Sequence, residues 1–210
     1  MAQFPVTYST LSAEALADWL EATYELGAVT GCRLLHRGLN DSYLVEAACG
    51  RHVLRIYRAG WRTADEIAYE MAVLEHLGGK GVPVALPMRR RDGNVVDWLR
   101  AAEGNRAAVL FTHAPGRELD GGTEDSRRYG RAVASVHAAT DDFKTGHERF
   151  ALDLDHLLTQ PLAAIRPFLR HRPADLDTIE TLAGLIRRRV AALPAGGGAV
   201  HPRTRPRARR

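Results

Sequence analysis

Three residues in the first third of the chain have the types and the order that could bind a phosphate group. Gly38 opens a turn-forming run that ends at Ser42, where backbone N–H groups can approach an anion closely because glycine has no side chain. Arg55 lies in an alternating apolar segment typical of a strand, and Glu70 lies in an amphipathic helical pattern. Together they predict a turn over a phosphate, a cation that binds it, and an acid that holds the cation.

Arg55 is the predicted phosphate-binding cation because neither lysine of the chain lies in a strand pattern. Lys80 and Lys144 both fall in loop-like sequence. An arginine differs from a lysine at such a site, because its planar guanidinium is larger and can bind two oxygens at once. The alternative is that Arg55 is an ordinary exposed residue of the strand.

Glu70 is the predicted partner of Arg55. It shares a helix face with Ile67 and Met71, and a carboxylate on an apolar face destabilises the protein unless a cation pairs with it. The alternative is a solvated surface acid, and that description fits Glu75 better than Glu70.

Hydrophobic periodicity predicts the elements that must position these residues. Strands are expected over residues 29–36, 42–48, 52–57, 94–99 and 107–112. Helices are expected over residues 11–24, 63–77, 124–140, 152–169 and 175–193. Ser12 and Thr63 are suitable N-caps, two glycines should end the second helix after residue 77, and Pro161 should break or kink the fourth. A mostly β part followed by a helical part predicts an α+β fold.

The charge of the chain sets its last residues apart from the rest. The formal net charge is +4, and residues 197–210 contain five arginines and no acid. The remainder has 24 Lys and Arg against 25 Asp and Glu, which is not the composition of a nucleic-acid-binding surface. No run approaches the roughly 20 apolar residues that span a membrane, and the first residues lack a signal-peptide pattern. We therefore expect a cytoplasmic protein without nucleic-acid or membrane partners.

Several other kinds of catalytic site are excluded by the motifs. The chain has neither the G-x-x-x-x-G-K-[ST] sequence of a P-loop nor a G-x-S-x-G nucleophile motif. Its histidines show no metal-ligand spacing and it has only two cysteines, so no zinc site is expected.

Short segments in a characteristic order carry a family resemblance. They are GLNDSYLVE, HVLRIYR, YEMAVLEHL, GVPVALPM, RAAVLF, APGRELDG, GRAVASVHAATDDF and LDLDHLL. In this order, from about Gly31 to Leu193, they resemble the aminoglycoside phosphotransferase superfamily, with the homoserine kinase and stress-response kinase A group as the closest branch. The resemblance implies a protein-kinase-like bilobal fold, with an antiparallel β-sheet N-lobe and one main helix over residues 1–113. A helical C-lobe, incomplete here, would occupy residues 114–196, and a basic disordered tail residues 197–210.

The same resemblance implies a nucleotide site with ATP and Mg²⁺ as cofactors. It puts Asn40 and Ser42 beside the phosphates, together with the three residues named first. Around Phe111 and His113, where a buried strand reaches the lobe junction, it implies backbone hydrogen bonds to adenine, although an ordinary strand end explains the same sequence. The acceptor would be a small hydroxylated or amino-alcohol molecule, or the Ser or Thr of a protein.

The resemblance fails near the end of the chain. The family has a catalytic loop of the pattern H-G-D-x-H-x-x-N, whose Asp positions the acceptor hydroxyl and whose Asn holds magnesium. Only His201 matches the start of this loop, Pro202 and Arg203 follow it, and no acid occurs after Glu180. We therefore expect a chain that turns over little or not at all. A frameshift or truncated gene model and a genuine pseudokinase or regulatory nucleotide-binding module both stay open.

Overall fold

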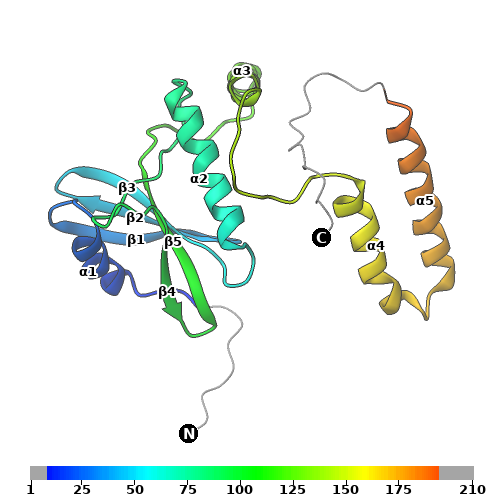
Figure 1. The fold of residues 1–210 in the computed structure, drawn as a ribbon, viewed down its shortest axis with the longest axis horizontal. Helices are drawn as coiled ribbons and strands as arrows, with labels where there is room; N and C mark the ends of the chain where they lie inside the picture. Colours follow the sequence, from blue (N-terminus) through cyan, green and yellow to red (C-terminus); the bar gives the residue numbers. More distant parts are fainter. Residues whose placement is uncertain (1–8, 194–210) are drawn as a thin grey trace, which may run out of the picture. The chain divides into compact units, whose positions relative to one another are not determined.

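The computed structural model describes residues 9–193, which fall into two compact units that divide between Glu148 and Arg149. The first unit is built on a five-stranded antiparallel sheet, and the second is helical (Figure 1). The sheet has the order β1-β2-β3-β5-β4, from β1 (Val29–Arg37), β2 (Asp41–Ala47), β3 (Gly50–Ile56), β4 (Asp97–Ala101) and β5 (Gly104–Thr112). The predicted lobe boundary near residue 113 stays a prediction.

One face of the sheet is covered by α1 (Ala13–Thr23), whose N-cap is Ser12 as predicted. The buried side chains of this face come from the helix and from alternate positions of the central strands: Leu16, Leu20, Tyr24, Leu26, Tyr43, Val45, Leu54, Ile56, Ala108 and Leu110. The strand alternation seen in the sequence therefore divides the sheet into two differently occupied faces.

The opposite face of the sheet packs against α2 (Ala64–Gly79), through Ile67 and Met71 of the helix and Val109 and Phe111 of β5. Thr63 caps this helix with a complete capping box, which fixes where it begins. The predicted end after residue 77 was wrong, because both glycines continue the helix. A Cβ at the first of them, Gly78, would lie 2.4 Å from a methyl group of the neighbouring segment, so glycine permits this close packing.

The segment between α2 and β4 is extended along β5. The N–H of Met88 donates to the carbonyl of Leu110 at 2.8 Å, and Pro87 forms a single bridge with Phe111. Asp92 and Gly93 form a turn, with Gly93 at a φ of 83°. The following strand begins three residues later than predicted, because this turn extends to residue 96.

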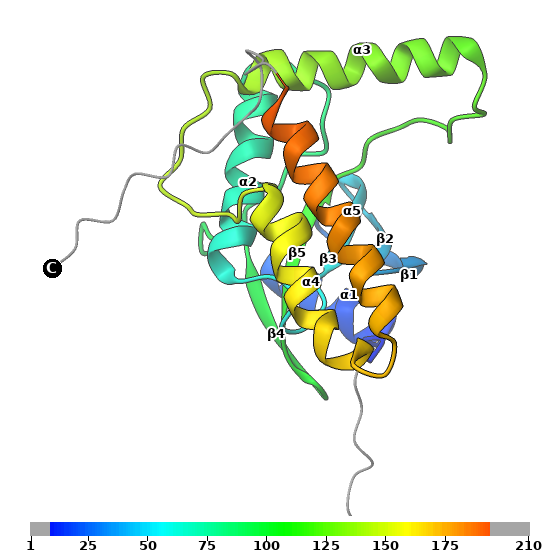
Figure 2. The same cartoon turned by 90° about the vertical axis from the view of Figure 1, so that its right-hand side faces the viewer.

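The remaining helices are α3 (Thr123–Thr140) in the first unit and four segments in the second. The C-terminal ends of α2 and α3 meet (Figure 2). The second unit contains a π-helical turn η1 (Asp155–Thr159), α4 (Gln160–Ile165), a 3₁₀ turn η2 (Arg166–Leu169) and α5 (Pro173–Ala191). The single helix predicted over residues 152–169 is thus three pieces. Prolines stand in the first turn of both α4 and η2, where a missing N–H is tolerated.

No helix among the described residues has both the length and the apolar character needed to cross a membrane. The predictions for residues 197–210, which include His201 and the disordered tail, concern residues outside the described range 9–193.

Candidate functional site

The register of the sheet brings Arg55 opposite two residues on its neighbouring strands. Ser42 of β2 and Val109 of β5 are its direct partners. Residues directly opposite in an antiparallel sheet share a face, so Ser42 and Arg55 both lie on the face that packs against α2. Leu54 and Ile56, on either side of Arg55 in sequence, are fully buried in the α1 face. Arg55 therefore lies on the face opposite these two residues.

Arg55 pairs with Glu70 across this face, as predicted. Its Nη1 donates to Oε1 of Glu70 at 2.7 Å, and the two side chains are 37% and 27% exposed. Because solvent screens a pair this exposed, it contributes at most about 1 kcal/mol to stability. The ion pair is thus a means of orienting the guanidinium rather than a major stabilising contact.

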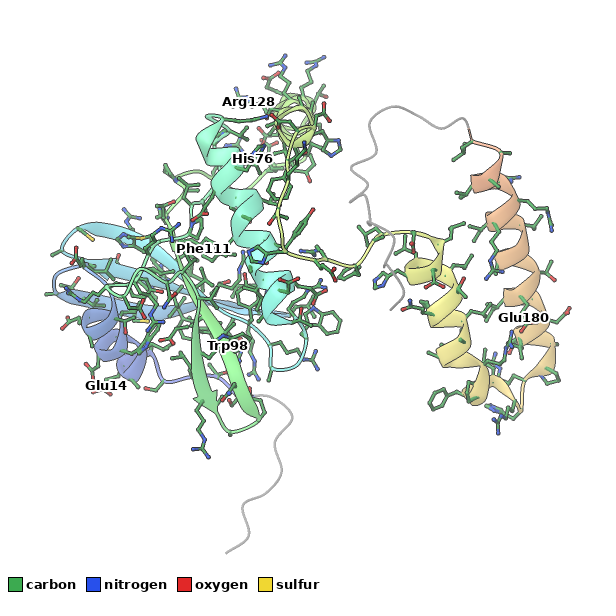
Figure 3. All side chains as sticks on the ribbon, in the orientation of Figure 1. Glu14, His76, Trp98, Phe111, Arg128 and Glu180 are labelled. Carbon is green, nitrogen blue, oxygen red and sulfur yellow. The ribbon has the colours of Figure 1, made fainter. Side chains whose placement is uncertain are left out.

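Two aromatic rings support the guanidinium of Arg55. Its central carbon lies 5.1 Å from the centroid of Phe111 and 5.9 Å from that of Tyr57 (Figure 3 labels Phe111). Burial raises the pKa of the Tyr57 hydroxyl, and the negative charge of Glu70 raises it further, so this phenol stays neutral. A guanidinium has five N–H donors and the ion pair uses one, which leaves donors for a second anion.

The turn before β2 is tied to the end of β3. The N–H of Gly38 donates to the carbonyl of Asn40 at 3.1 Å, and the Asn40 side-chain oxygen accepts the N–H of Arg58 at 3.2 Å. A Cβ at Gly38 would lie 3.0 Å from Nε2 of His36, so a larger residue there requires the exposed His36 ring to shift. The N–H groups of Leu39 and Asn40 donate to no other described residue, so they are the two amides that this turn offers to a ligand.

The residues predicted to lie beside the adenine, Phe111 and His113, are at the C-terminal end of β5 and just after it. Phe111 is buried and serves as the support of Arg55, and His113 lines a shallow, open hollow together with Arg51 and residues 115–116. His113 is four residues beyond the β5 partner of Arg55, which is about 13 Å along a strand. An extended nucleotide could bridge that separation, and the backbone contacts to adenine stay a prediction.

The helix that carries Glu70 contacts the last turn of α3 and the residues that follow it at several points along its length. His76 Nε2 lies 2.8 Å from the carbonyl of Ala139 (Figure 3 labels His76). Three further pairs join the two segments: Asp65 with His147 at 2.9 Å, Tyr69 with Phe143 at 5.6 Å between ring centroids, and Lys80 with Asp142. These contacts hold α2, and with it Glu70, against movement relative to this strap of residues 139–148.

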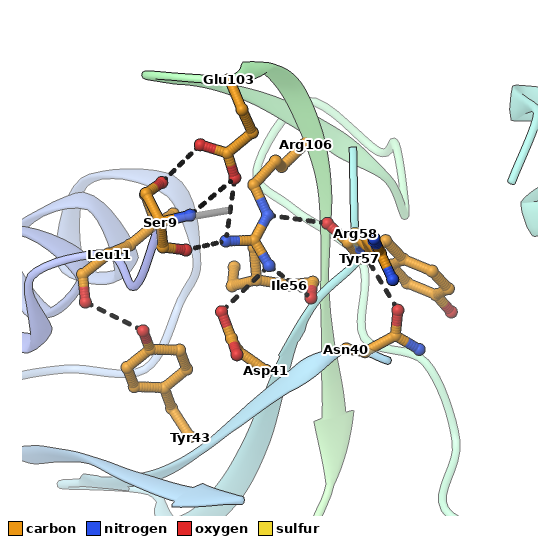
Figure 4. Close-up of polar contacts among 10 residues, drawn as sticks. All are labelled: Ser9, Leu11, Asn40, Asp41, Tyr43, Ile56, Tyr57, Arg58, Glu103 and Arg106. Atoms are coloured by element: carbon orange, nitrogen blue, oxygen red, sulfur yellow. Dashed lines mark hydrogen bonds and ion pairs between the residues drawn. The ribbon is translucent and has the colours of Figure 1, made fainter. Parts of the chain in front are cut away.

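The charged residues that sequence reasoning missed are Arg106 and Asp41, which are both completely buried and form an ion pair (Figure 4). The only signal for Arg106 was a cation at the start of an otherwise apolar strand pattern, and Asp41 looked like an ordinary turn residue.

No dedicated metal cage is found in the described part of the chain. Within residues 9–193, no three His, Cys, Asp or Glu side chains gather around one point. No chemical step at this site is therefore assigned to a metal here.

The sequence is similar to a known protein family and to several individual proteins. Residues 31–205 match the phosphotransferase enzyme family. A protein of uncharacterised function from Deinococcus radiodurans is 43% identical over 200 residues, which cover 94% of this chain and 58% of the relative. A homoserine kinase of Methylobacterium radiotolerans is 28% identical over 203 residues, which cover 92% of this chain and 59% of the relative. The chain thus spans less than two thirds of the length of these relatives.

A solved structure confirms the predicted fold class. Amicoumacin kinase, in complex with AMP-PNP, Ca²⁺ and Ami, superimposes with a TM-score of 0.69 at 16% identity, over 89% of this chain and 55% of the kinase. At this identity the likeness concerns the α+β, protein-kinase-like fold alone. The match over most of the sequence is the stronger finding, and by it the chain belongs to the phosphotransferase enzyme family.

Proposed function

We propose that the first unit binds ATP and that the whole protein is an ATP-dependent phosphotransferase. The observation that carries the proposal is the ion pair of Arg55 and Glu70, stacked on Phe111 and opposite Ser42. Phosphoryl transfer depends almost entirely on positioning the phosphates and stabilising their charge, so a held cation beside a turn with unused amides suits this chemistry.

The proposed roles follow from the geometry of each group. The guanidinium of Arg55 binds phosphate oxygens through the donors that Glu70 leaves unused, and two parallel hydrogen bonds fix its orientation on the anion. The amides of Leu39 and Asn40 bind the phosphates from the turn, with Gly38 and Ser42 at its two ends. The backbone around His113 contacts the adenine.

The acceptor we propose is a small hydroxylated or amino-alcohol molecule, with the Ser or Thr of a protein as the broader possibility. One relative is named as a homoserine kinase, and the amicoumacin kinase structure contains AMP-PNP with Ca²⁺ and Ami. These names support a nucleotide and a small-molecule acceptor. The alternative function, a non-catalytic or regulatory nucleotide-binding module, requires the same binding site and differs only in turnover.

Calorimetric titration of the full chain with ATP tests the proposal through Arg55→Ala. We expect the affinity to fall more than tenfold, since a charge-assisted contact contributes about 1.5–3 kcal/mol. Arg100→Ala is the matched control, because Arg100 is an exposed arginine of β4 and should leave the affinity unchanged. Equal affinities of Arg55→Ala and the parent chain would remove Arg55 from the site, and a parent chain that binds no ATP would refute the proposed function.

A further inference from the structure

Arg106 of β5 is a fully buried guanidinium with its own fully buried acid. Its Nη2 donates to Oδ2 of Asp41 at 2.9 Å, and both side chains have no exposed area (Figure 4). Burying such a pair removes two charges from water, and this desolvation offsets much of their attraction, so buried ion pairs are poor sources of net stability. Because this ion pair adds little net stability, we look for a role other than stabilising the fold.

The other donors of Arg106 join three segments that are far apart in sequence. Nε donates to the carbonyl of Tyr57 at 2.8 Å, and Nη2 also donates to the carbonyl of Ile56 at 3.3 Å. Nη1 donates to the carbonyl of Ser9 and lies 3.6 Å from Oε1 of Glu103, a second acid, which also accepts the Ser9 hydroxyl at 2.6 Å. The guanidinium therefore fixes the end of β3 and the segment before α1 to β5.

Asp41 places this network directly beneath the turn of the candidate site. It is the first residue of β2, immediately after Asn40, and it pairs with Arg37 of β1 and Ile56 of β3. Its side chain lies on the α1 face, whereas Ser42, one residue later, lies on the face of Arg55. The turn is thus held from one side by the ion pair and from the other by the hydrogen bond between Asn40 and Arg58.

We infer that Arg106 and Asp41 are positioning residues for phosphate binding, which rests on the function proposed above. They hold the turn and the end of β3 in the spacing at which the amides of Leu39 and Asn40 meet the same phosphates as Arg55. A loop that is already ordered before the ligand arrives binds more tightly than one that must be ordered on binding. Neither residue contacts the nucleotide.

Two measurements on Asp41→Asn test this inference in the full chain. This variant keeps the shape of the side chain and an acceptor for Arg106 but removes the charge. Without nucleotide, we expect hydrogen exchange to rise about tenfold at the amides of Gly38 and Arg58, whose hydrogen bonds to Asn40 order the turn, with no change in the β4–β5 hairpin. With ATP, we expect the affinity to fall about fivefold. Leu20→Met, a volume-conserving change in the same core that does not touch the network, is the control and should change neither quantity.

A second variant separates positioning from folding, and it decides the matter if Asp41→Asn does not fold. The double variant Asp41→Leu and Arg106→Met replaces the pair by apolar groups, an exchange that often preserves stability. Glu103, the second acid beside Arg106, keeps the two hydrogen bonds that Ser9 donates to it. We expect it to fold and still show fast exchange at the turn and weak ATP binding. Protected turn amides and parental affinity in this double variant would overturn the inference. If the parent chain binds no ATP, the proposed function fails, and the exchange of the turn amides alone decides the role of the pair.

Discussion

Two arginines on neighbouring strands, Arg55 of β3 and Arg106 of β5, show how burial assigns different roles to one residue type. Arg55 is partly exposed, uses one donor on Glu70 and keeps the others for a ligand. Arg106 is fully buried, forms ion pairs with two acids, Asp41 and Glu103, and donates to three backbone carbonyls. The first guanidinium is therefore suited to binding an anion, and the second to holding the strands that carry the first.

At the residue scale, Glu70→Gln should separate orientation from binding. Glutamine keeps the acceptor for Arg55 but loses the charge, and a pair this exposed contributes at most about 1 kcal/mol. We expect the ATP affinity to fall by roughly fivefold or less, which is smaller than the loss for Arg55→Ala, with little change in melting temperature. Calorimetry and thermal melting measure both quantities.

Glu75→Gln is the control for this prediction, because Glu75 is also an ion-paired acid of α2 but pairs with Arg89 at 2.8 Å, outside the site. It should leave the ATP affinity unchanged. If the two variants behave alike, Glu70 does not orient Arg55 for the nucleotide.

The site was predictable where a residue breaks a local pattern. Arg55 interrupts the apolar alternation of its strand and Glu70 interrupts an apolar helix face, so each pointed to a partner on a nearby element. The pair of Arg106 and Asp41 could not be found this way, because the two residues are 65 positions apart and each fits its local pattern. Only the strand order β2-β3-β5, which a sequence does not state, brings them together.

At the scale of elements, the start of α2 is set by local sequence and its end by a contact with a distant segment. Its capping box is a local signal and set its start correctly, whereas its end depends on the fit of Gly78 against Leu86, a contact made by another segment. The helical pieces around Pro161 and Pro167 likewise depend partly on local sequence and partly on packing. The sequence indicated a break, but the choice between π, α and 3₁₀ turns depends on packing that periodicity does not encode.

The strap of residues 139–148 gives α2 a predictable response to acid. The hydrogen bond from the Lys80 ammonium is the main cause that lowers the pKa of Asp142 below its ordinary value of 3.8, and His76 adds to it. A carboxyl with a lowered pKa stabilises the folded state above the unfolded value, and this stabilisation is lost as the pH falls through the folded value. The strap should therefore loosen from α2 in acid.

Asp142→Asn tests that response. We expect its melting temperature to lie below that of the parent near neutral pH, and the difference to vanish well below pH 3.8. Asp141→Asn is the control, since Asp141 is an exposed neighbouring acid that should show no such pH-dependent difference. A constant difference between parent and Asp142→Asn at all pH values would mean that the ionised carboxylate does not matter.

At the scale of the whole molecule, the two units bury their apolar side chains to different extents. The first has two cores, one on each face of its sheet. The helices of the second present many large apolar side chains to solvent: Leu152, Leu157, Ile165, Phe168, Leu182, Leu185, Ile186, Val190 and Leu193. Apolar surface left in water is unfavourable by about 25 cal/mol per Å², so several such side chains amount to several kcal/mol.

We therefore expect the purified chain to associate with itself through the helices of the second unit. Sedimentation velocity should show a weight that rises with concentration, and an apolar dye should bind the protein. Leu157→Gln should reduce both effects because it makes this surface more polar. Leu119→Gln is the matched control, since Leu119 lies in the first unit and both leucines are 57% exposed. A monodisperse monomer at every concentration, with one sharp melting transition at high temperature, would contradict the prediction, because those helices would then be stable with their apolar faces in water.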